Sequence, residues 1–102
     1  MKRPKCYISG KITGLDEALA RENFEFAEHH VHNHGYEVIN PFKLPHDHDK
    51  SWEAYMLENL AALSKCKCIY FLPNWRSSPG ARIEKLWAER LKIIILNPKE
   101  VA

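Results

Sequence analysis

The chain has 102 residues, of which 45% are hydrophobic and 27% charged, and its formal net charge is +2. This length predicts a single domain over residues 1–102 with one core of moderate size. The composition is that of a folded globular protein, and the net charge is too small to indicate a nucleic acid polymer or a membrane surface as partner. No stretch approaches the roughly 20 apolar residues that span a bilayer, and the three cysteines fit reduced thiols, so we expect a cytoplasmic protein.

The first half of the chain predicts two strands separated by a helix. Residues 6–9 form a short apolar run that indicates a strand. Over residues 16–34, apolar side chains recur at three- and four-residue spacing, as they do along the buried face of a helix. Asp16 is a suitable N-cap for this helix, and Gly35 is a suitable stop residue. Residues 36–40 then predict a second strand.

The second half of the chain predicts a helix, a strand, a further helix and a last strand. A polar loop over residues 41–50 leads to Ser51, which is a suitable N-cap for the second helix. Residues 68–72 are nearly all apolar, which is typical of a strand covered on both faces. Residues 93–96 form another apolar run and predict a fourth strand. In the second helix we expect three side chains to face inward: Tyr55, Leu60 and Leu63. In the third helix the apolar side chains at helical spacing are Ile83, Leu86, Trp87 and Leu91.

This alternation predicts an α/β fold: a small doubly wound sheet, flavodoxin-like or Rossmann-like, of about four parallel strands with flanking helices. In such sheets a ligand binds beyond the carboxyl ends of the strands, where residues 9–14 and 73–84 are expected to lie. Gly10 and Gly14 allow the backbone to approach a ligand, or they simply form a strand-to-helix turn. Ser78 precedes a helix, where it suits a phosphate or sugar hydroxyl, or only caps the helix.

Two segments at this edge of the predicted sheet resemble a known superfamily. Residues 7–14 and 69–84, which read YISGKITG and IYFLPNWRSSPGARIE, resemble the nucleoside 2-deoxyribosyltransferase-like superfamily. With residues 35–41 and 52–63, the resemblance covers nearly the full length and is closest to the short, often phage-encoded DUF4406 domain. It implies an enzyme that cleaves or transfers at the bond between C1′ and the base of a small-molecule nucleoside or nucleotide.

The resemblance also implies roles for individual residues. Glu84 falls at the position of the nucleophile, which forms a covalent glycosyl-enzyme that water or a second base resolves. Tyr7 falls at the tyrosine that holds this carboxylate, and Ser78 at the serine that contacts a 5′-phosphate. Asn59 falls where the superfamily has an aspartate that acts on the base. The other residues expected to bind substrate are Ser9, Gly10, Lys11, Trp75 and Gly80.

The departures from the superfamily pattern leave other functions open. An amide at Asn59 can hydrogen-bond a base but cannot act as a general acid, a contribution typically worth about 10²–10⁴-fold. This chain has Lys67 where the superfamily has a second acidic residue. It has Thr13 where the nucleotide-preferring members have an arginine. The alternative is therefore a catalytically weak or inactive nucleotide-binding protein, or a protein that keeps only the fold.

No metal and no other cofactor is expected. His30 and His34 have the i, i+4 spacing with which two ligands share a helix face, but no motif supplies a third ligand. Cys66 and Cys68 are one residue short of a zinc-knuckle spacing, and beside a buried strand they are expected to be small core residues. The resemblance also implies a homodimer or a higher homo-oligomer.

Overall fold

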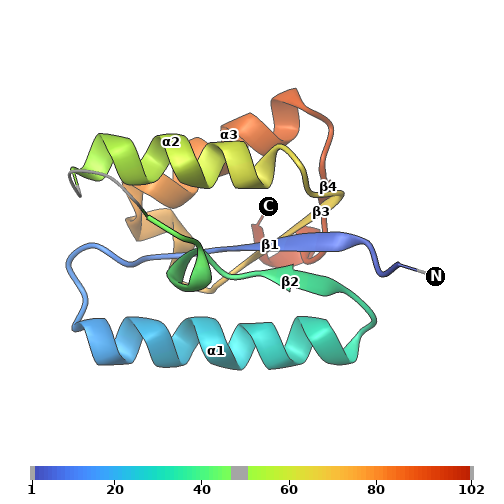
Figure 1. The fold of residues 1–102 in the computed structure, drawn as a ribbon, viewed down its shortest axis with the longest axis horizontal. Helices are drawn as coiled ribbons and strands as arrows, with labels where there is room; N and C mark the ends of the chain where they lie inside the picture. The colour runs from blue at the N-terminus through green and yellow to red at the C-terminus, as the bar shows by residue number, and fades with distance from the viewer. Residues whose placement is uncertain (1, 47–50, 102) are drawn as a thin grey trace.

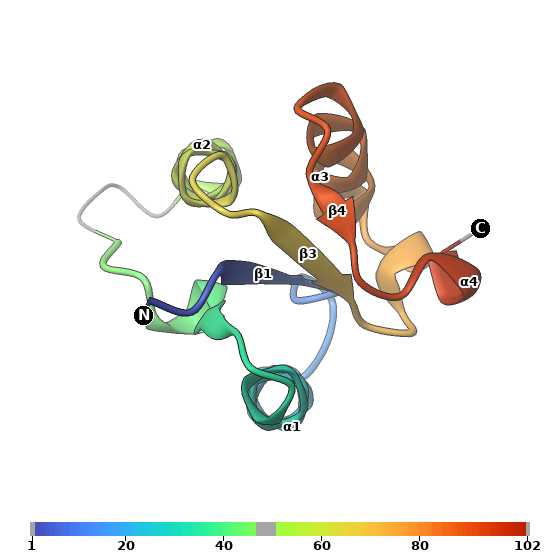
Figure 2. The same ribbon diagram turned by 90° about the vertical axis from the view of Figure 1, so that its right-hand side faces the viewer.

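The computed structural model describes residues 2–46 and 51–101, and the predicted loop residues 47–50 lie outside this part. The described residues form one all-parallel sheet with the strand order β2-β1-β3-β4, which confirms the predicted fold. Helix α1 covers one face of the sheet, and α2 and α3 cover the other (Figure 2). The strands are β1 (Lys5–Ser9), β2 (Glu37–Ile39), β3 (Cys68–Phe71) and β4 (Ile94–Ile95), and the helices are α1 (Glu17–Asn33), α2 (Trp52–Leu63), α3 (Pro79–Arg90) and α4 (Pro98–Val101).

The first helix begins and ends where the sequence predicts. The Asp16 side chain accepts a hydrogen bond from the backbone N–H of Leu19 at 3.2 Å, which is N-cap geometry. Gly35 has a φ of +98°, a left-handed conformation that favours glycine and stops the helix. The face toward the sheet is formed by Ala20, Phe24, Ala27 and Val31, all buried. As Figure 1 shows, α1 runs antiparallel to the strand that precedes it, as a crossover helix must.

The central strand β1 determines what lies on each face of the sheet. Its residues Cys6 to Ser9 are completely buried, and successive side chains point to opposite faces. Cys6 and Ile8 pack with Phe24 of α1, whereas Tyr7 packs on the other face. Ser9 alternates with Ile8, so it shares the face of Tyr7 and lies under α3. This alternation brings two hydroxyl groups below the same helix.

The third helix forms as predicted, but a face of small residues packs on the sheet. Its large apolar side chains do not pack on the sheet, and Leu86 is 68% exposed. The other three are Ile83, Trp87 and Leu91. The buried residues of α3 are Ala81, Glu84 and Ala88. Small alanines let the helix approach the sheet closely, so its larger apolar side chains are left on the outer face.

The ends of the chain's last elements also differ from the prediction. Strand β4 has only two residues instead of the four predicted at 93–96, and the short helix α4 follows it, with Pro98 at its first position and Asn97 before it. In α2, Leu63 is fully buried as predicted, while Tyr55 and Leu60 are only partly buried. Cys6, Cys66 and Cys68 are free, and burial raises the pKa of each thiol, that of Cys66 to about 11, so they are protonated core residues.

Gly10 is required by the close approach of two strand ends. A Cβ atom at this position would lie 2.8 Å from the Cβ atom of Leu72, whose backbone N–H donates to the Ser9 carbonyl at 2.8 Å. We therefore expect Gly10→Ala to lower the free energy of unfolding by about 1–3 kcal/mol, measured as a shift of the urea midpoint. The exposed Thr13→Ala in the same loop is the control, and an unchanged midpoint for Gly10→Ala would contradict the packing argument.

Candidate active site at the carboxyl ends of the strands

A buried carboxylate lies over the carboxyl end of β1. Glu84 of α3 is only 4% exposed. The Tyr7 hydroxyl donates a hydrogen bond to Glu84 Oε2 and the Ser9 hydroxyl donates one to Oε1, both at 2.6 Å. Each carboxylate oxygen thus has one donor from the same strand. This arrangement fixes the carboxylate plane and leaves lone pairs free for a ligand.

Burial changes the protonation behaviour of this site. It raises the pKa of Glu84 to about 7, against the lowering effect of the hydrogen bonds from Ser9 and Tyr7. Burial and the charge of Glu84 raise the pKa of Tyr7 well above its usual value, so Tyr7 stays a hydrogen-bond donor. A carboxyl group that titrates near neutral pH in a cavity is a candidate nucleophile, acid or base.

Glu84 opens into a cavity of about 320 Å³, the size of a small-ligand site. Its walls are formed by the loop after β1, the start of α1, the 3-10 turn Pro41–Lys43, one face of α2 and the amino end of α3. Tyr7, Gly10, Asn59, Ser78 and Gly80 line it together with Glu84. The structure therefore brings these predicted residues around one space, while Ser9 contributes through its hydrogen bond to Glu84.

Asn59 is the most unusual polar residue of the cavity wall. It is 8% exposed, and its Oδ1 atom is buried without a hydrogen-bond partner among the described residues. A buried acceptor without a donor costs about 1–3 kcal/mol. Because protein atoms enclose this oxygen, a ligand in the cavity does not reach it in this conformation. Asn59 lies one turn after Tyr55 on the same face of α2, and both line the cavity.

The amino end of α3 forms another wall. Ser78 is the N-cap, and its Oγ atom accepts from the Ala81 backbone N–H at 3.1 Å, which leaves its O–H free to donate. A Cβ atom at Gly80 would lie 3.1 Å from Met56 Sδ, so the glycine permits close contact between α3 and α2. The positive end of the helix dipole and the Ser78 hydroxyl suit an oxygen-rich part of a ligand.

Besides Ser9, two further predicted substrate-binding residues do not line the cavity. Trp75 is buried in the core, where its ring lies 5.4 Å from that of Phe71. The Lys11 backbone N–H donates to Asn74 Oδ1 at 3.0 Å, which ties the loop after β1 to the turn after β3. Trp75 thus packs in the core and the Lys11 backbone supports the loop, while contact of either side chain with a ligand stays a prediction.

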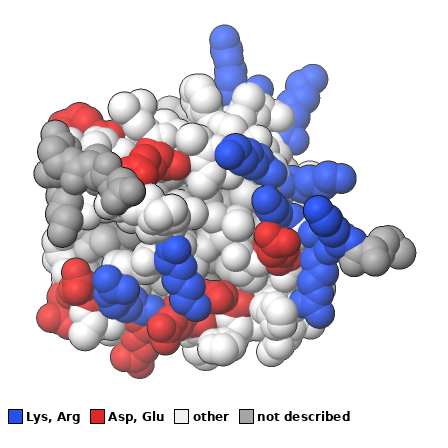
Figure 3. Space-filling model, in the orientation of Figure 1, with Lys and Arg blue, Asp and Glu red and all other residues white. Residues whose placement is uncertain are grey.

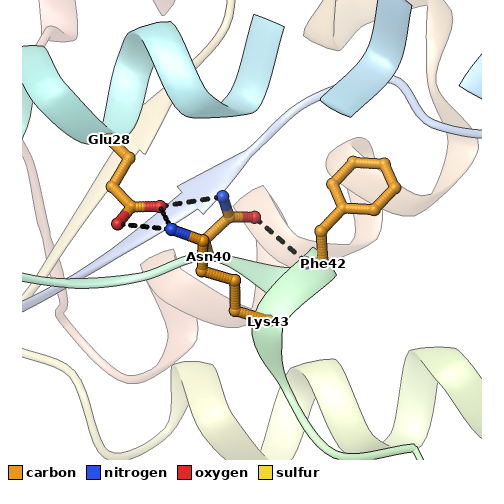
Figure 4. A network of polar contacts seen from close by, with 4 residues as sticks. All are labelled: Glu28, Asn40, Phe42 and Lys43. Atoms are coloured by element: carbon orange, nitrogen blue, oxygen red, sulfur yellow. Dashed lines mark hydrogen bonds and ion pairs between the residues drawn. The ribbon is translucent and has the colours of Figure 1, made fainter. Parts of the chain in front are cut away.

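The turn after β2 is held by a network that sequence reasoning missed (Figure 4). Glu28 of α1 accepts hydrogen bonds from Asn40 and from Lys43, both at 3.0 Å, and Asn40 Oδ1 accepts from the Phe42 N–H at 3.0 Å. Burial alone would raise the pKa of Glu28, but the hydrogen bonds from Asn40 and Lys43 lower it. The network positions Phe42, whose ring lines the cavity.

Arg21 is a second residue that sequence reasoning missed. It projects from α1 so that its guanidinium carbon lies 4.7 Å from the centre of the Phe42 ring, a cation–π distance. Glu17, one turn earlier, pairs with it at 3.6 Å. Among the described residues that line the cavity, Arg21 is the only Lys or Arg. No local sequence signal marks it, because its partner Phe42 lies 21 positions away in the chain.

The described residues include no group of three or more His, Cys, Asp or Glu that could hold a metal ion. At the carboxyl end of α1, the His34 Nδ1 atom lies 2.8 Å from the His30 carbonyl oxygen, and the centre of the His30 ring lies 5.6 Å from that of Tyr70 in β3. In the same part of the chain, no helix is long and apolar enough to cross a membrane.

The fold and the site define a small, parallel α/β protein that holds a buried, hydrogen-bonded carboxylate over the carboxyl ends of its strands. The chain belongs to the DUF4406 family, a domain of unknown function, whose profile matches residues 4–97. No curated protein matches the chain. The family assignment agrees with the resemblance at this level, and the chemistry has to be argued from the site.

Proposed function

We propose that the protein is an enzyme of the nucleoside 2-deoxyribosyltransferase-like kind, which acts at the bond between C1′ and the base of a nucleoside or nucleotide. The observation that carries this proposal is the Glu84 carboxylate, held by Tyr7 and Ser9 and open to a cavity of nucleoside-like size. A buried carboxylate with both oxygens oriented suits attack on a sugar carbon. Simple structural stabilisation would not favour a carboxyl group at such a buried position.

The reaction proceeds in two displacements. A Glu84 oxygen attacks C1′ and forms an ester, while the bond from C1′ to the base nitrogen breaks and its electron pair leaves with the base. The departing base takes a proton from water. Water, or a second base, then attacks C1′ and gives its proton to solvent, while the ester bond breaks and releases the Glu84 carboxylate. Tyr7 and Ser9 act as positioning residues, because their hydroxyls hold the two oxygens of the carboxylate.

A catalytically weak nucleotide-binding protein is the second candidate. Its support is Asn59, which lines the cavity and cannot supply a proton to the leaving base. Lys67 adds no support, because it precedes β3 at the amino end of the strand, whereas the cavity lies at the carboxyl ends. The difference between the two candidates is therefore a question of turnover.

The first test is a chromatographic assay for free base. The panel consists of ribo- and deoxyribonucleosides and their 5′-monophosphates, each incubated with the parent protein and with Glu84→Ala. Base release by the parent and none by the variant supports the glycosidic chemistry and names the substrate. No release from any compound, with binding still detected by calorimetry, supports the binding protein instead.

The outer face of α3 supports a homo-oligomer. Ile83, Leu86, Trp87 and Leu91 form an exposed apolar stripe on this helix, which is the pattern of a surface that packs against another protein. We propose that a second copy of the chain packs on this stripe. A two-fold axis next to the stripe would place the stripes of the two copies against each other. Glu84 lies on the inner face of the same helix, so assembly would also brace the site.

We expect Leu86→Glu to shift the protein toward monomer, because a charge would be buried in the interface. Light scattering coupled to size-exclusion chromatography measures the mass. Phe26→Glu is the control, since Phe26 is 78% exposed on α1, on the opposite face of the sheet. A monomeric parent protein, or dissociation by Phe26→Glu alone, would contradict the assembly through α3.

A further inference from the structure

Charge is unevenly distributed over the surface, although the formal net charge is only +2. Lys and Arg are most numerous at the end of the molecule where the strands begin, and Asp and Glu gather at the other end, along α1 (Figure 3). We propose that the basic end binds the phosphate backbone of a nucleic acid, independently of its base sequence. This surface lies at the opposite end of the strands from the cavity over Glu84, so the inference does not depend on the proposed function.

The fold brings these cations together at one edge of the sheet, which we call the basic edge. The strands are all parallel, so their starts meet at this edge, and the segments that lead into β1, β3 and β4 are each basic. Strand β2 instead starts with Glu37 and lies beyond β1, so a carboxylate marks one end of the edge. The exposed cations of the basic edge are Lys2, Arg3, Lys5, Lys65, Lys67, Arg90 and Lys92.

The first backbone hydrogen bonds between the strands place three lysines in a row. The Lys67 N–H donates to the Lys5 carbonyl at 3.0 Å, and the Ile94 N–H donates to the Lys67 carbonyl at 3.1 Å. Lys5, Lys67 and Lys92 therefore lie at the starts of three neighbouring strands, and neighbouring strands are about 4.8 Å apart. Flexible side chains in such a row can contact successive phosphates of one nucleic acid strand.

The charge of the basic edge is not neutralised by ion pairs among the described residues. Its cations form none there, whereas elsewhere Arg21, Lys43 and Lys85 each pair with a glutamate. Arg3 donates to the His32 carbonyl at 3.0 Å, which holds the guanidinium in place without neutralising it. Binding of these cations to phosphates would release the counterions of the nucleic acid, and this release favours association.

Lys92 carries its charge at a strained position of the backbone. Its φ is +59°, a left-handed conformation that glycine adopts with less strain, and Gly35 takes the corresponding position after α1. The Ile93 N–H donates to the Ala88 carbonyl at 2.9 Å, which is the hydrogen bond that ends a helix at such a residue. The chain thus has a cation where the backbone favours glycine.

The helix dipole accounts for only part of the basic edge. In a parallel α/β fold the carboxyl ends of the crossover helices lie at the same edge as the strand starts, and cations are favoured there. Lys65 and Arg90, at the ends of α2 and α3, fit this explanation. Lys5 opens β1 and Lys92 has a strained backbone, so the charge of these two residues needs another reason.

The chemistry of the partner follows from the residue types and from their arrangement. Most cations of the basic edge are lysines, which meet phosphate oxygens as flexible point charges, whereas carboxylates are recognised best by the fork of arginine. The lysines form a row, as the phosphates of a nucleic acid do, whereas an anionic membrane presents its charge over a plane. A nucleic acid backbone therefore fits the basic edge better than an acidic protein or a membrane.

The test measures binding of fluorescent oligonucleotides by anisotropy. Single strands of about 20 nucleotides, in two unrelated base sequences, are titrated between about 50 and 200 mM salt. We expect the same affinity for both sequences. The logarithm of the binding constant should fall against the logarithm of the salt concentration with a slope of about −2 to −4, because each phosphate contacted on a single strand contributes about −0.7.

Two variants locate the binding on the basic edge. Lys5→Gln/Lys67→Gln should weaken binding by about tenfold and make the slope shallower by about 1.4, since two phosphate contacts are lost. The control Arg82→Gln/Lys85→Gln removes the same charge from the amino half of α3 and should keep the affinity within about threefold. Lys92→Gly should weaken binding without lowering the urea midpoint of unfolding, because glycine relieves the left-handed strain.

Several results would overturn the inference. No binding at the lowest salt concentration, equal affinity of the parent and Lys5→Gln/Lys67→Gln, or a preference for one base sequence would each do so. Tighter binding to phosphatidylserine vesicles or to polyglutamate, at equal salt and equal concentration of anionic groups, would assign the basic edge to a membrane or to an acidic protein instead. Lys92→Gly with a lower urea midpoint and unchanged affinity would show that this lysine serves only the helix end, against the inference. Glu84→Ala should bind as the parent does, so this test is separate from that of the proposed function.

Discussion

We expect Glu84→Gln to lower kcat/KM for base release by at least about a thousandfold. The amide is almost the same size as the carboxylate and can keep hydrogen bonds to Tyr7 and Ser9, whose hydroxyls both donate and accept. It cannot form the ester with C1′, so the first displacement fails. The measurement is initial rates of base release with the substrate that the parent protein cleaves fastest.

Glu89→Gln is the matched control for this substitution. Glu89 lies on the same helix, is exposed, and pairs with Lys85 at 3.3 Å. It should leave the rate within about twofold of the parent, because an exposed ion pair contributes little. Retention of more than about a tenth of the parent rate by Glu84→Gln would show that Glu84 is not the nucleophile and would favour an acid–base or binding role.

The strands and helices follow from the sequence because their signals are local. Cys68–Phe71 is apolar throughout and lies in the middle of the sheet, and the buried residues of α1 recur with the helical period. The apolar stripe on α3 has the same period but faces outward. Periodicity identifies an apolar face, and only the packing of Ala81 and Ala88 shows which face meets the sheet.

The site depends on contacts between distant parts of the chain. Helix periodicity alone does not single out Glu84, because a glutamate on a helix is usually exposed, and the resemblance to a known superfamily was needed to identify it. Tyr7 reaches Glu84 across 77 positions, and Arg21 meets Phe42 through the turn after β2. Asn59 was predicted from that same resemblance, but its unpartnered oxygen is visible only in three dimensions.

We also expect the stability of the protein to fall as pH rises through the range in which Glu84 titrates. Burial raises the pKa of Glu84 from 4.5 to about 7 in the folded state. The unfolded chain therefore loses this proton first, and it binds fewer protons than the folded protein between these two pH values. Glu84 makes its full contribution to the free energy of unfolding below pH 4.5. This contribution, about 3 kcal/mol, is lost by about pH 7.

Comparing the parent with Glu84→Gln isolates this effect, because the six histidines and the other carboxylates titrate alike in both proteins. We expect Glu84→Gln to gain stability relative to the parent as pH rises. The difference in melting temperature between the variant and the parent should be larger at pH 8 than at pH 4.5 by about 10 °C or more. Thermal unfolding from pH 4.5 to 8 measures the difference. A difference that stays constant over this range would show that the carboxylate is not buried at a cost. A rising difference would mean that the fold keeps a destabilising charge where the proposed nucleophile needs it, which is the compromise between stability and activity expected at a catalytic group.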